Sequence, residues 1–227
     1  MAGLSIVKSQ DILLLLKLVS LYKQEQQIER GHISKAWPLD WQDWEVIEEE
    51  QSEPDDLLLP ERKFGANEFI ASLYTARKLE VETGISKSQI NLSLNRCIEI
   101  GLAKKDRKIG IPRANVRALF EFIVFGIKYV FPTKPQEITR GIATAFAAPV
   151  LKEKLMSTGE YVPIWPDAKG NTKGQAVEPL YKSAVHAVRR DPEMYSMLAL
   201  VDAIRIGRPR EKSLAVELLK QHLGVSG

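Results

Sequence analysis

The chain has few of the residues from which metal centres and disulfide frameworks are built. It contains a single cysteine, Cys97, so no internal disulfide can form. The three histidines, His32, His186 and His222, are scattered, and no Cys/His cluster has the spacing of a zinc site. We therefore expect a protein of a reducing compartment, with no structural metal and no cofactor.

Long apolar runs are also missing. The most hydrophobic stretch, ILLLLKLVSL at residues 12–21, is too short to span a bilayer. Asp11 precedes it, Lys17 interrupts it and no small-residue cleavage site follows, which argues against a signal peptide. We expect a buried helix from about Ser9 to Gln24, in a cytoplasmic protein that does not enter a membrane. A chain of 227 residues with 44% hydrophobic content suffices for one large domain or two small ones.

The sequence shows no grouping of catalytic residues. No nucleophile, base and orienting residue fall into a recognisable set, and the acidic residues are too irregularly spaced to indicate paired catalytic carboxylates. The segment GNTKG at residues 170–174 lacks the spacing of a phosphate-binding loop. We therefore expect that the protein is not an enzyme.

Charge is strongly separated along the chain, although the net charge is only +3. From Asp40 to Asp56 there are many acidic residues and no lysine or arginine, and the overlapping segment WPLDWQDW, residues 37–44, adds three tryptophans. From Arg62 to Arg140 basic residues outnumber acidic ones. The pattern indicates an acidic, tryptophan-containing insert at about residues 25–66, followed by a basic module.

The basic module predicts two short helices with a sharp turn between them. The first lies within SLYTARKLEVETG and ends at Gly84, which suits a left-handed C-terminal cap. Ser86 is well placed to cap the second helix. The apolar positions that recur at helical spacing are Leu73, Ala76, Leu79 and Val81 on the first helix, and Ile90, Leu94 and Cys97 or Ile98 on the second. The next residues, AKKDRKIGI, predict a hairpin with a basic tip at Asp106 and Arg107.

Helix, turn, helix and basic hairpin in this order resemble a winged helix-turn-helix. Residues 75–111 are similar to the DNA-binding core of bacterial MarR-like regulators, whose helices often read TARELAELTGISKSTVSRALKRLEEAGL. The matching positions are Thr75, Ala76, Leu79, Thr83, Gly84, Ile85, Ser86, Lys87, Ser88, Leu94, Arg96, Gly101 and Leu102. The chain departs from this pattern at Leu92, where relatives commonly place an arginine toward DNA. A leucine suits the methyl group of thymine instead.

The resemblance implies double-stranded DNA as the partner, with the helix after Ser86 in the major groove. The residues expected to read bases are Lys87, Ser88, Gln89 and Asn91. Those expected to contact phosphates are Ser86, Arg96, Lys104, Lys105, Arg107 and Lys108. The alternative is that the same side chains form an ordinary solvated surface or a protein-binding face.

The fold implied is mainly α. A winged helix-turn-helix domain with a small β-wing occupies residues 1–112, a connecting or dimerisation helix residues 113–132, and a helical, loop-rich domain of unknown role residues 133–227. The connecting helix is apolar around most of its circumference, so it is either buried between two halves or the interface of a homodimer. Residues 191–193, Asp-Pro-Glu, predict the start of a later helix.

A second basic group, Arg205, Arg208 and Arg210, surrounds the break between the last two predicted helices. It is a solvated corner, a phosphate contact beside the winged helix, or a contact for an acidic protein partner. The function expected is a dimeric, sequence-specific, DNA-binding transcriptional regulator that represses its own gene. The alternative is an antitoxin-like or defence-system accessory protein whose C-terminal domain binds a protein. An acidic insert folded over residues 87–108 would mimic DNA and inhibit binding.

Overall fold

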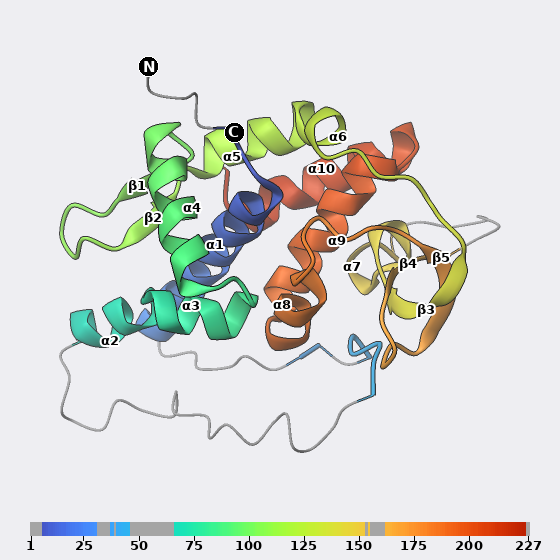
Figure 1. The fold of residues 1–227 in the computed structure, drawn as a ribbon, viewed down its shortest axis with the longest axis horizontal. Coiled ribbons are helices and arrows are strands. Elements are labelled where there is room, and N and C mark those ends of the chain that lie inside the picture. The colour runs from blue at the N-terminus through green and yellow to red at the C-terminus, as the bar shows by residue number, and fades with distance from the viewer. Residues whose placement is uncertain are drawn as a thin grey trace.

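The computed structural model describes residues 6–30, 37–38, 40–45, 66–152, 154 and 162–225, and this part is mainly helical, as the sequence predicts (Figure 1). The elements in the first half are α1 (Ser9–Glu29), α2 (Ala66–Leu73), α3 (Ala76–Thr83), α4 (Lys87–Glu99), β1 (Ala103–Lys105), β2 (Pro112–Ala114), α5 (Val116–Phe125) and α6 (Ile127–Val130). Those in the second half are β3 (Ile138–Ala143), η2 (Ala145–Ala147), α7 (Pro149–Lys152), β4 (Pro163–Pro166), β5 (Thr172–Ala176), α8 (Ala184–Arg190), α9 (Pro192–Ile206) and α10 (Pro209–Leu223).

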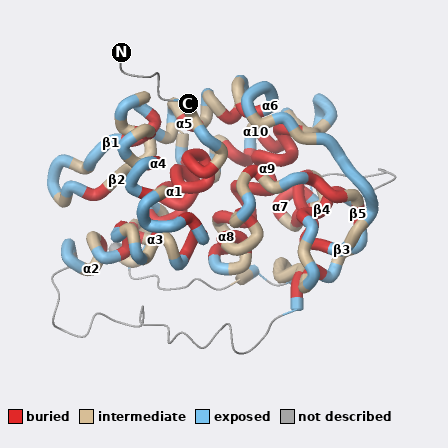
Figure 2. Tube along the Cα trace, in the orientation of Figure 1, coloured by how far each residue is buried: buried red, intermediate tan, exposed pale blue. Residues whose placement is uncertain are grey.

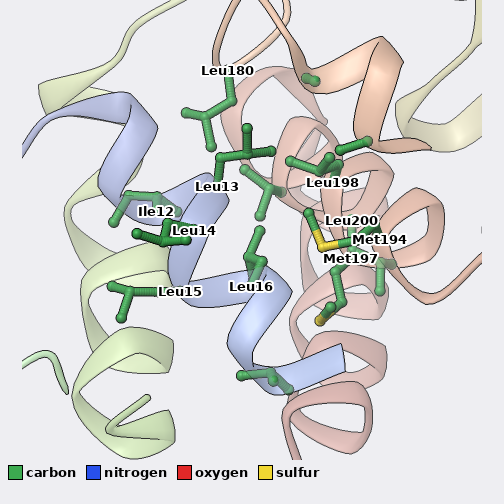
Figure 3. Packing of buried hydrophobic residues seen from close by; sticks show 14 of the residues in the cluster. Ile12, Leu13, Leu14, Leu15, Leu16, Leu180, Met194, Met197, Leu198 and Leu200 are labelled. Atoms are coloured by element: carbon green, nitrogen blue, oxygen red, sulfur yellow. The ribbon is translucent and has the colours of Figure 1, made fainter. Parts of the chain in front are cut away.

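The helix at the centre of the molecule is α1. Its segment from Ile12 to Leu16 is completely buried, and buried residues concentrate on α1 and α9 (Figure 2). Leu13 lies on the side of α1 that faces Met194 and Leu198 of α9 (Figure 3). A helix that is apolar around its circumference must be covered on several sides, and α1 contacts α4, β2 and α9. The buried helix predicted from the sequence is confirmed.

The last turns of α1 continue to Glu29, beyond the predicted end near Gln24. No apolar periodicity marks these turns in the sequence. They are held instead by Glu25, which is buried and accepts hydrogen bonds from Arg113 and Tyr74. The first residues assigned to the acidic insert therefore belong to the central helix.

The predicted pair of short helices corresponds to α3 and α4. The hydroxyl of Thr75 accepts a hydrogen bond from the N–H of Lys78 and so caps the start of α3. The helix ends at Gly84, which has a left-handed φ of 67°, as predicted. Leu73 belongs to a separate helix, α2, because Thr75 is extended and interrupts the helix expected there.

The basic hairpin is formed by β1 and β2, which pair antiparallel. Its second strand begins at Pro112, so the hairpin is longer than predicted. At the tip the Asp106 carboxylate accepts hydrogen bonds from the N–H groups of Lys108 and Ile109, and Gly110 takes a left-handed φ of 73°. The bonds from Ile109 and Lys108 lower the pKa of Asp106. The tip is therefore an ordered turn that is stabilised by the ionised carboxylate of Asp106.

Residues 113–132 form a strand end and two helices, where the sequence predicts one helix. Residues up to Ala114 belong to the hairpin, and Gly126 separates α5 from α6. The buried residues on the inner side are Leu119, Ile123 and Ile127. On the outer side, Phe125 and Tyr129 are 72% and 80% exposed. The connector is thus covered on one side only.

The C-terminal region contains a small sheet that the sequence pattern does not predict. β3 pairs antiparallel with both β4 and β5, and β4 pairs parallel with β5, so the strands close on one another. This closure depends on glycine, since a Cβ at Gly141 would lie 1.9 Å from the carbonyl oxygen of Trp165. Strands this short and rich in glycine and proline lack a clear alternating pattern.

The chain's four tryptophans gather around one tyrosine. The ring centroids of Trp37, Trp41, Trp44 and Trp165 lie 6.5, 6.3, 6.0 and 5.9 Å from that of Tyr195. Trp37, Trp41 and Trp44 lie before the run of acidic residues that begins at Glu48. The tryptophan-containing segment therefore packs against α9 and the small sheet.

One hydrophobic core runs through both predicted domains. It includes buried side chains from α1, α3 and α4 together with others from α8, α9 and α10. The boundary expected after residue 112 therefore separates parts of the chain that share a core around α1.

Candidate nucleic-acid interface

The exposed face of α4 is polar, with a single large apolar side chain. Ser88, Asn91, Leu92 and Asn95 are exposed there, and Leu92 has 54% of its surface accessible. Ser88, Leu92 and Asn95 follow one another at intervals of four and three, which places them on one side of a helix. Asn95 was not among the expected base-reading residues, and Leu92 was considered only as a contact for a thymine methyl group, although this spacing could have identified both.

Gln89 lies at the edge of this face and is only partly exposed. The side-chain amide of Gln10 on α1 donates hydrogen bonds to Gln89 Oε1 at 3.0 Å and to Ser93 Oγ at 2.9 Å. Gln89 is therefore attached to α1 through its oxygen. It differs in this from Ser88 and Asn91, which project from the open side of α4.

The prediction that Arg96 contacts phosphate is corrected by the structure. Its guanidinium donates to both carboxylate oxygens of Asp11, at 2.7 Å and 2.5 Å, and its side chain is 14% exposed. The hydrogen bond to Asp11 raises the pKa of Arg96 despite partial burial. Because Asp11 is fully buried, this ion pair fixes α4 against α1.

Two expected DNA contacts at the start of α4 are exposed. The N–H of Lys87 donates to Glu80 Oε1, and its ammonium lies 3.8 Å from Glu80 Oε2. An exposed pair at this distance contributes roughly 0–1 kcal/mol, so Lys87 can exchange it for another anion. Ser86 Oγ lies 3.4 Å from Ser88 Oγ. Both residues remain open to a ligand at this end of the helix.

The basic hairpin extends away from the helices beside α4 (Figure 1). Its exposed cations are Lys104, Lys105, Arg107 and Lys108. None of these four has an ion-pair partner within the described part of the chain. Unpaired exposed cations attract polyanions at long range.

Arg113 fixes the base of the hairpin to α1. It forms a bidentate ion pair with Glu25 and donates a further hydrogen bond to the hydroxyl of Tyr74. Its guanidinium also lies over the rings of Tyr22 and Tyr74, 4.7 Å and 5.1 Å from the centroids. The hairpin therefore has a rigid attachment, and Arg113 is part of the scaffold.

The three arginines of the second basic group do not lie together on the surface. Arg205, predicted to contact a partner, is 5% exposed and donates to Asp202 Oδ1 and to the carbonyl oxygens of Phe131 and Glu178. It cannot contact a partner in this state, and that prediction is corrected. Arg208 and Arg210 are exposed at the start of α10, at the end of that helix away from the basic hairpin (Figure 1). They do not lie beside the basic hairpin (Figure 1).

Two acidic residues of the insert bind the small sheet. Asp43 accepts hydrogen bonds from the N–H of Ala143 and the hydroxyl of Thr172, and Glu45 pairs with Arg140 at 2.7 Å. Asp43 and Glu45 are therefore engaged by the small sheet and do not cover the exposed polar face of α4. Most of the other acidic residues of the insert, from Glu48 onward, lie outside the described residues.

A small hollow of about 240 Å³ lies between α1, α9 and α10. The Glu193 carboxylate in it is already engaged by neighbouring side chains: Oε1 lies 2.5 Å from Lys23 Nζ and 2.8 Å from His222 Nδ1. Glu193 has a lowered pKa because these neighbours more than offset its desolvation. The volume is below the range of roughly 300–1,000 Å³ typical of ligand cavities. In the described ranges no cluster of His, Cys, Asp and Glu could hold a metal ion.

Comparison of the chain with protein-family models, curated proteins and solved structures finds no match. Within the part of the chain that the structure describes, no helix combines the length and apolar character needed to cross a lipid bilayer.

Proposed function

We propose that the protein is a sequence-specific, double-stranded-DNA-binding transcriptional regulator that uses α3, α4 and the β1–β2 hairpin as a winged helix-turn-helix. The supporting observation is the exposed polar face of α4 beside a hairpin whose four exposed cations have no ion-pair partner among the residues that the structure describes. The base edges of the major groove present donors, acceptors and the thymine methyl group. The side chains that suit them are Ser88, Asn91, Leu92 and Asn95, with Lys87 and Gln89 at the margin.

The hairpin and α4 have different roles in this proposal. Lys104, Lys105, Arg107 and Lys108 bind phosphates and supply affinity that depends on salt. The side chains of α4 contact base edges and supply sequence preference. The ion pairs of Asp11 with Arg96 and of Glu25 with Arg113 hold both parts on α1. The proposed reading surface, which is the exposed face of α4 with the β1–β2 hairpin, is thereby preorganised.

Replacing Asn91, Leu92 and Asn95 together by alanine is expected to remove sequence preference. Affinity for a specific site should fall by about 10- to 100-fold, while affinity for unrelated DNA changes little. Alanine is a good helix former, so α4 should remain folded. The measurement is equilibrium binding to DNA from upstream of the protein's own coding sequence and to scrambled DNA, over a salt series.

A matched control for this experiment replaces Ser213 and Gln221 by alanine on the exposed side of α10. It should bind like the wild type. Unchanged discrimination in the α4 variant would refute the role of these residues. A wild type that binds no DNA specifically would refute the proposed function, and would favour the alternative that exposed Arg208 and Arg210 hold an acidic protein partner.

We also propose that the protein is a homodimer that pairs through the outer side of α5 and α6. Phe125 and Tyr129 are the largest exposed apolar side chains there, next to Val130. Dimeric regulators of this kind read two half-sites.

Phe125→Glu with Tyr129→Glu should give a monomer by light scattering and weaken binding to paired half-sites. A variant with a new charge elsewhere, Ile138→Glu, should keep the dimer; a wild type that is monomeric would contradict the pairing.

A further inference from the structure

The amide of Gln10 connects the buried side of α1 to the edge of the reading surface. Gln10 is 7% exposed, and its nitrogen donates to Gln89 Oε1 and to Ser93 Oγ. A side-chain amide nitrogen carries two hydrogens. Both hydrogen bonds of the Gln10 nitrogen therefore go to α4, and Gln10 is too deeply buried to contact DNA itself.

Gln89 is the one partner of Gln10 that also reaches the exposed side of α4, since Ser93 is completely buried. Its oxygen faces the Gln10 nitrogen, so its own nitrogen is directed away from that contact. Reversing the Gln89 amide would bring two amide nitrogens together without an acceptor between them. While the Gln10 nitrogen faces α4, as it does in this structure, the contact therefore determines which end of the Gln89 amide is available outside.

We propose that Gln10 is a positioning residue for sequence readout, which holds Gln89 as a hydrogen-bond donor toward the major groove. This inference rests on the proposed DNA-binding function. Guanine presents two acceptors, N7 and O6, whereas adenine presents one acceptor and one donor. A glutamine that offers only N–H groups discriminates in favour of guanine. A free glutamine pairs with both groups of adenine.

The test measures binding to every single-base-pair variant of a specific site. The position contacted by Gln89 is the one whose preference disappears in a Gln89→Ala variant. At that position the wild type should prefer guanine by about five- to tenfold, the lower end of the range for a good base contact. In a Gln10→Met variant, which keeps the shape but removes the donor, adenine should become as good as guanine.

A Gln10→Glu variant gives a sharper outcome, because its carboxylate accepts a hydrogen bond from the Gln89 nitrogen. The Gln89 oxygen is then turned outward, and preference should move to adenine or cytosine, which present amino donors. Preferences at the other positions should be unchanged, which controls for the fold of α4. Unchanged preference at the Gln89 position in both Gln10 variants would overturn the inference while leaving DNA binding intact. A loss of preference at all positions would also overturn it, because Gln10 would then act through stability alone.

A second readout needs no DNA. In nuclear magnetic resonance spectra of the free protein, the side-chain amide protons of Gln89 should exchange faster with water in the wild type than in Gln10→Glu, where they point inward. Equal exchange in the two proteins would overturn the inference. If the wild type shows the expected exchange but binds no DNA specifically, the proposed DNA-binding function is wrong, although Gln10 still orients the Gln89 amide.

Discussion

A Lys17→Met variant is expected to lose about 3–5 kcal/mol of unfolding free energy, because the substitution removes the buried cation that compensates two buried carboxylates. Lys17 is completely buried on α1. Its ammonium lies 2.8 Å from Glu82 Oε2 on α3 and 2.8 Å from Asp191 Oδ2 at the start of α9. Ser20 donates a further hydrogen bond to Asp191 at 2.5 Å. The group therefore joins the helices of the proposed DNA-binding unit to the C-terminal helices.

The contribution of Lys17 should depend on pH in a defined direction. Burial alone lowers its pKa, but Asp191 and Glu82 more than offset this, and the pKa is raised above its ordinary value of 10.5. A group whose pKa is raised on folding stabilises the protein fully below its unfolded pKa. This stabilisation is lost as the pH rises through the folded value. The difference between the wild type and Lys17→Met should therefore be constant near neutrality and shrink above about pH 10.5.

Urea unfolding followed by tryptophan fluorescence measures both effects, since all four tryptophans surround Tyr195 in the core. Lys23→Met is the matched control, because its ion pair with Glu193 is partly exposed and should contribute at most about 1 kcal/mol. Adding Glu82→Gln to Lys17→Met should restore about 1–3 kcal/mol by removing one of the two buried negative charges that Lys17 compensates. A loss as small as that of the control would contradict the buried-charge account.

Local signals in the sequence predicted the parts of the fold whose causes are themselves local. Gly84 ends α3 because few other residues adopt its left-handed conformation. Asp191 caps α9 with hydrogen bonds from the N–H groups of Glu193 and Met194, in the Asp-Pro-Glu pattern that predicted this start. The leucine-rich segment of α1 was recognisably a buried helix for the same reason: its composition alone requires burial.

The sequence could not predict which basic side chains are buried in ion pairs and which are exposed, because their partners come from distant parts of the chain. Arg96 carries the same charge as Lys104, but Asp11, which is 85 positions away in sequence, neutralises Arg96 and not Lys104. Arg205 is buried by Asp202 and by carbonyl groups of other segments, while its neighbour Arg208 is exposed. Sequence reasoning located the candidate interface on α4 and the hairpin, whereas the contacts of α1 determine which side chains remain available there.

Removing the four hairpin cations is expected to lower affinity for duplex DNA by about 10²–10³-fold at about 0.1 M salt. Each neutralised phosphate contributes about 0.9 to the slope of log affinity against log salt, so losing four contacts makes the slope shallower by about 3.6. Sequence preference should survive, because the α4 side chains are unchanged. The variant replaces Lys104, Lys105, Arg107 and Lys108 by alanine.

The hairpin prediction must be separated from an effect of total charge, because any loss of positive charge weakens attraction to DNA. The matched control has the same net charge and replaces exposed lysines elsewhere by alanine: Lys134, Lys152, Lys154 and Lys173. Its affinity should fall by no more than about threefold, since screening over roughly 8–10 Å limits the reach of distant charges. Because Arg113 holds the base of the hairpin on Glu25, the hairpin variant should keep its stability to urea. Equal losses of affinity in the two variants would mean that net charge alone attracts DNA, and the hairpin would then have no specific role.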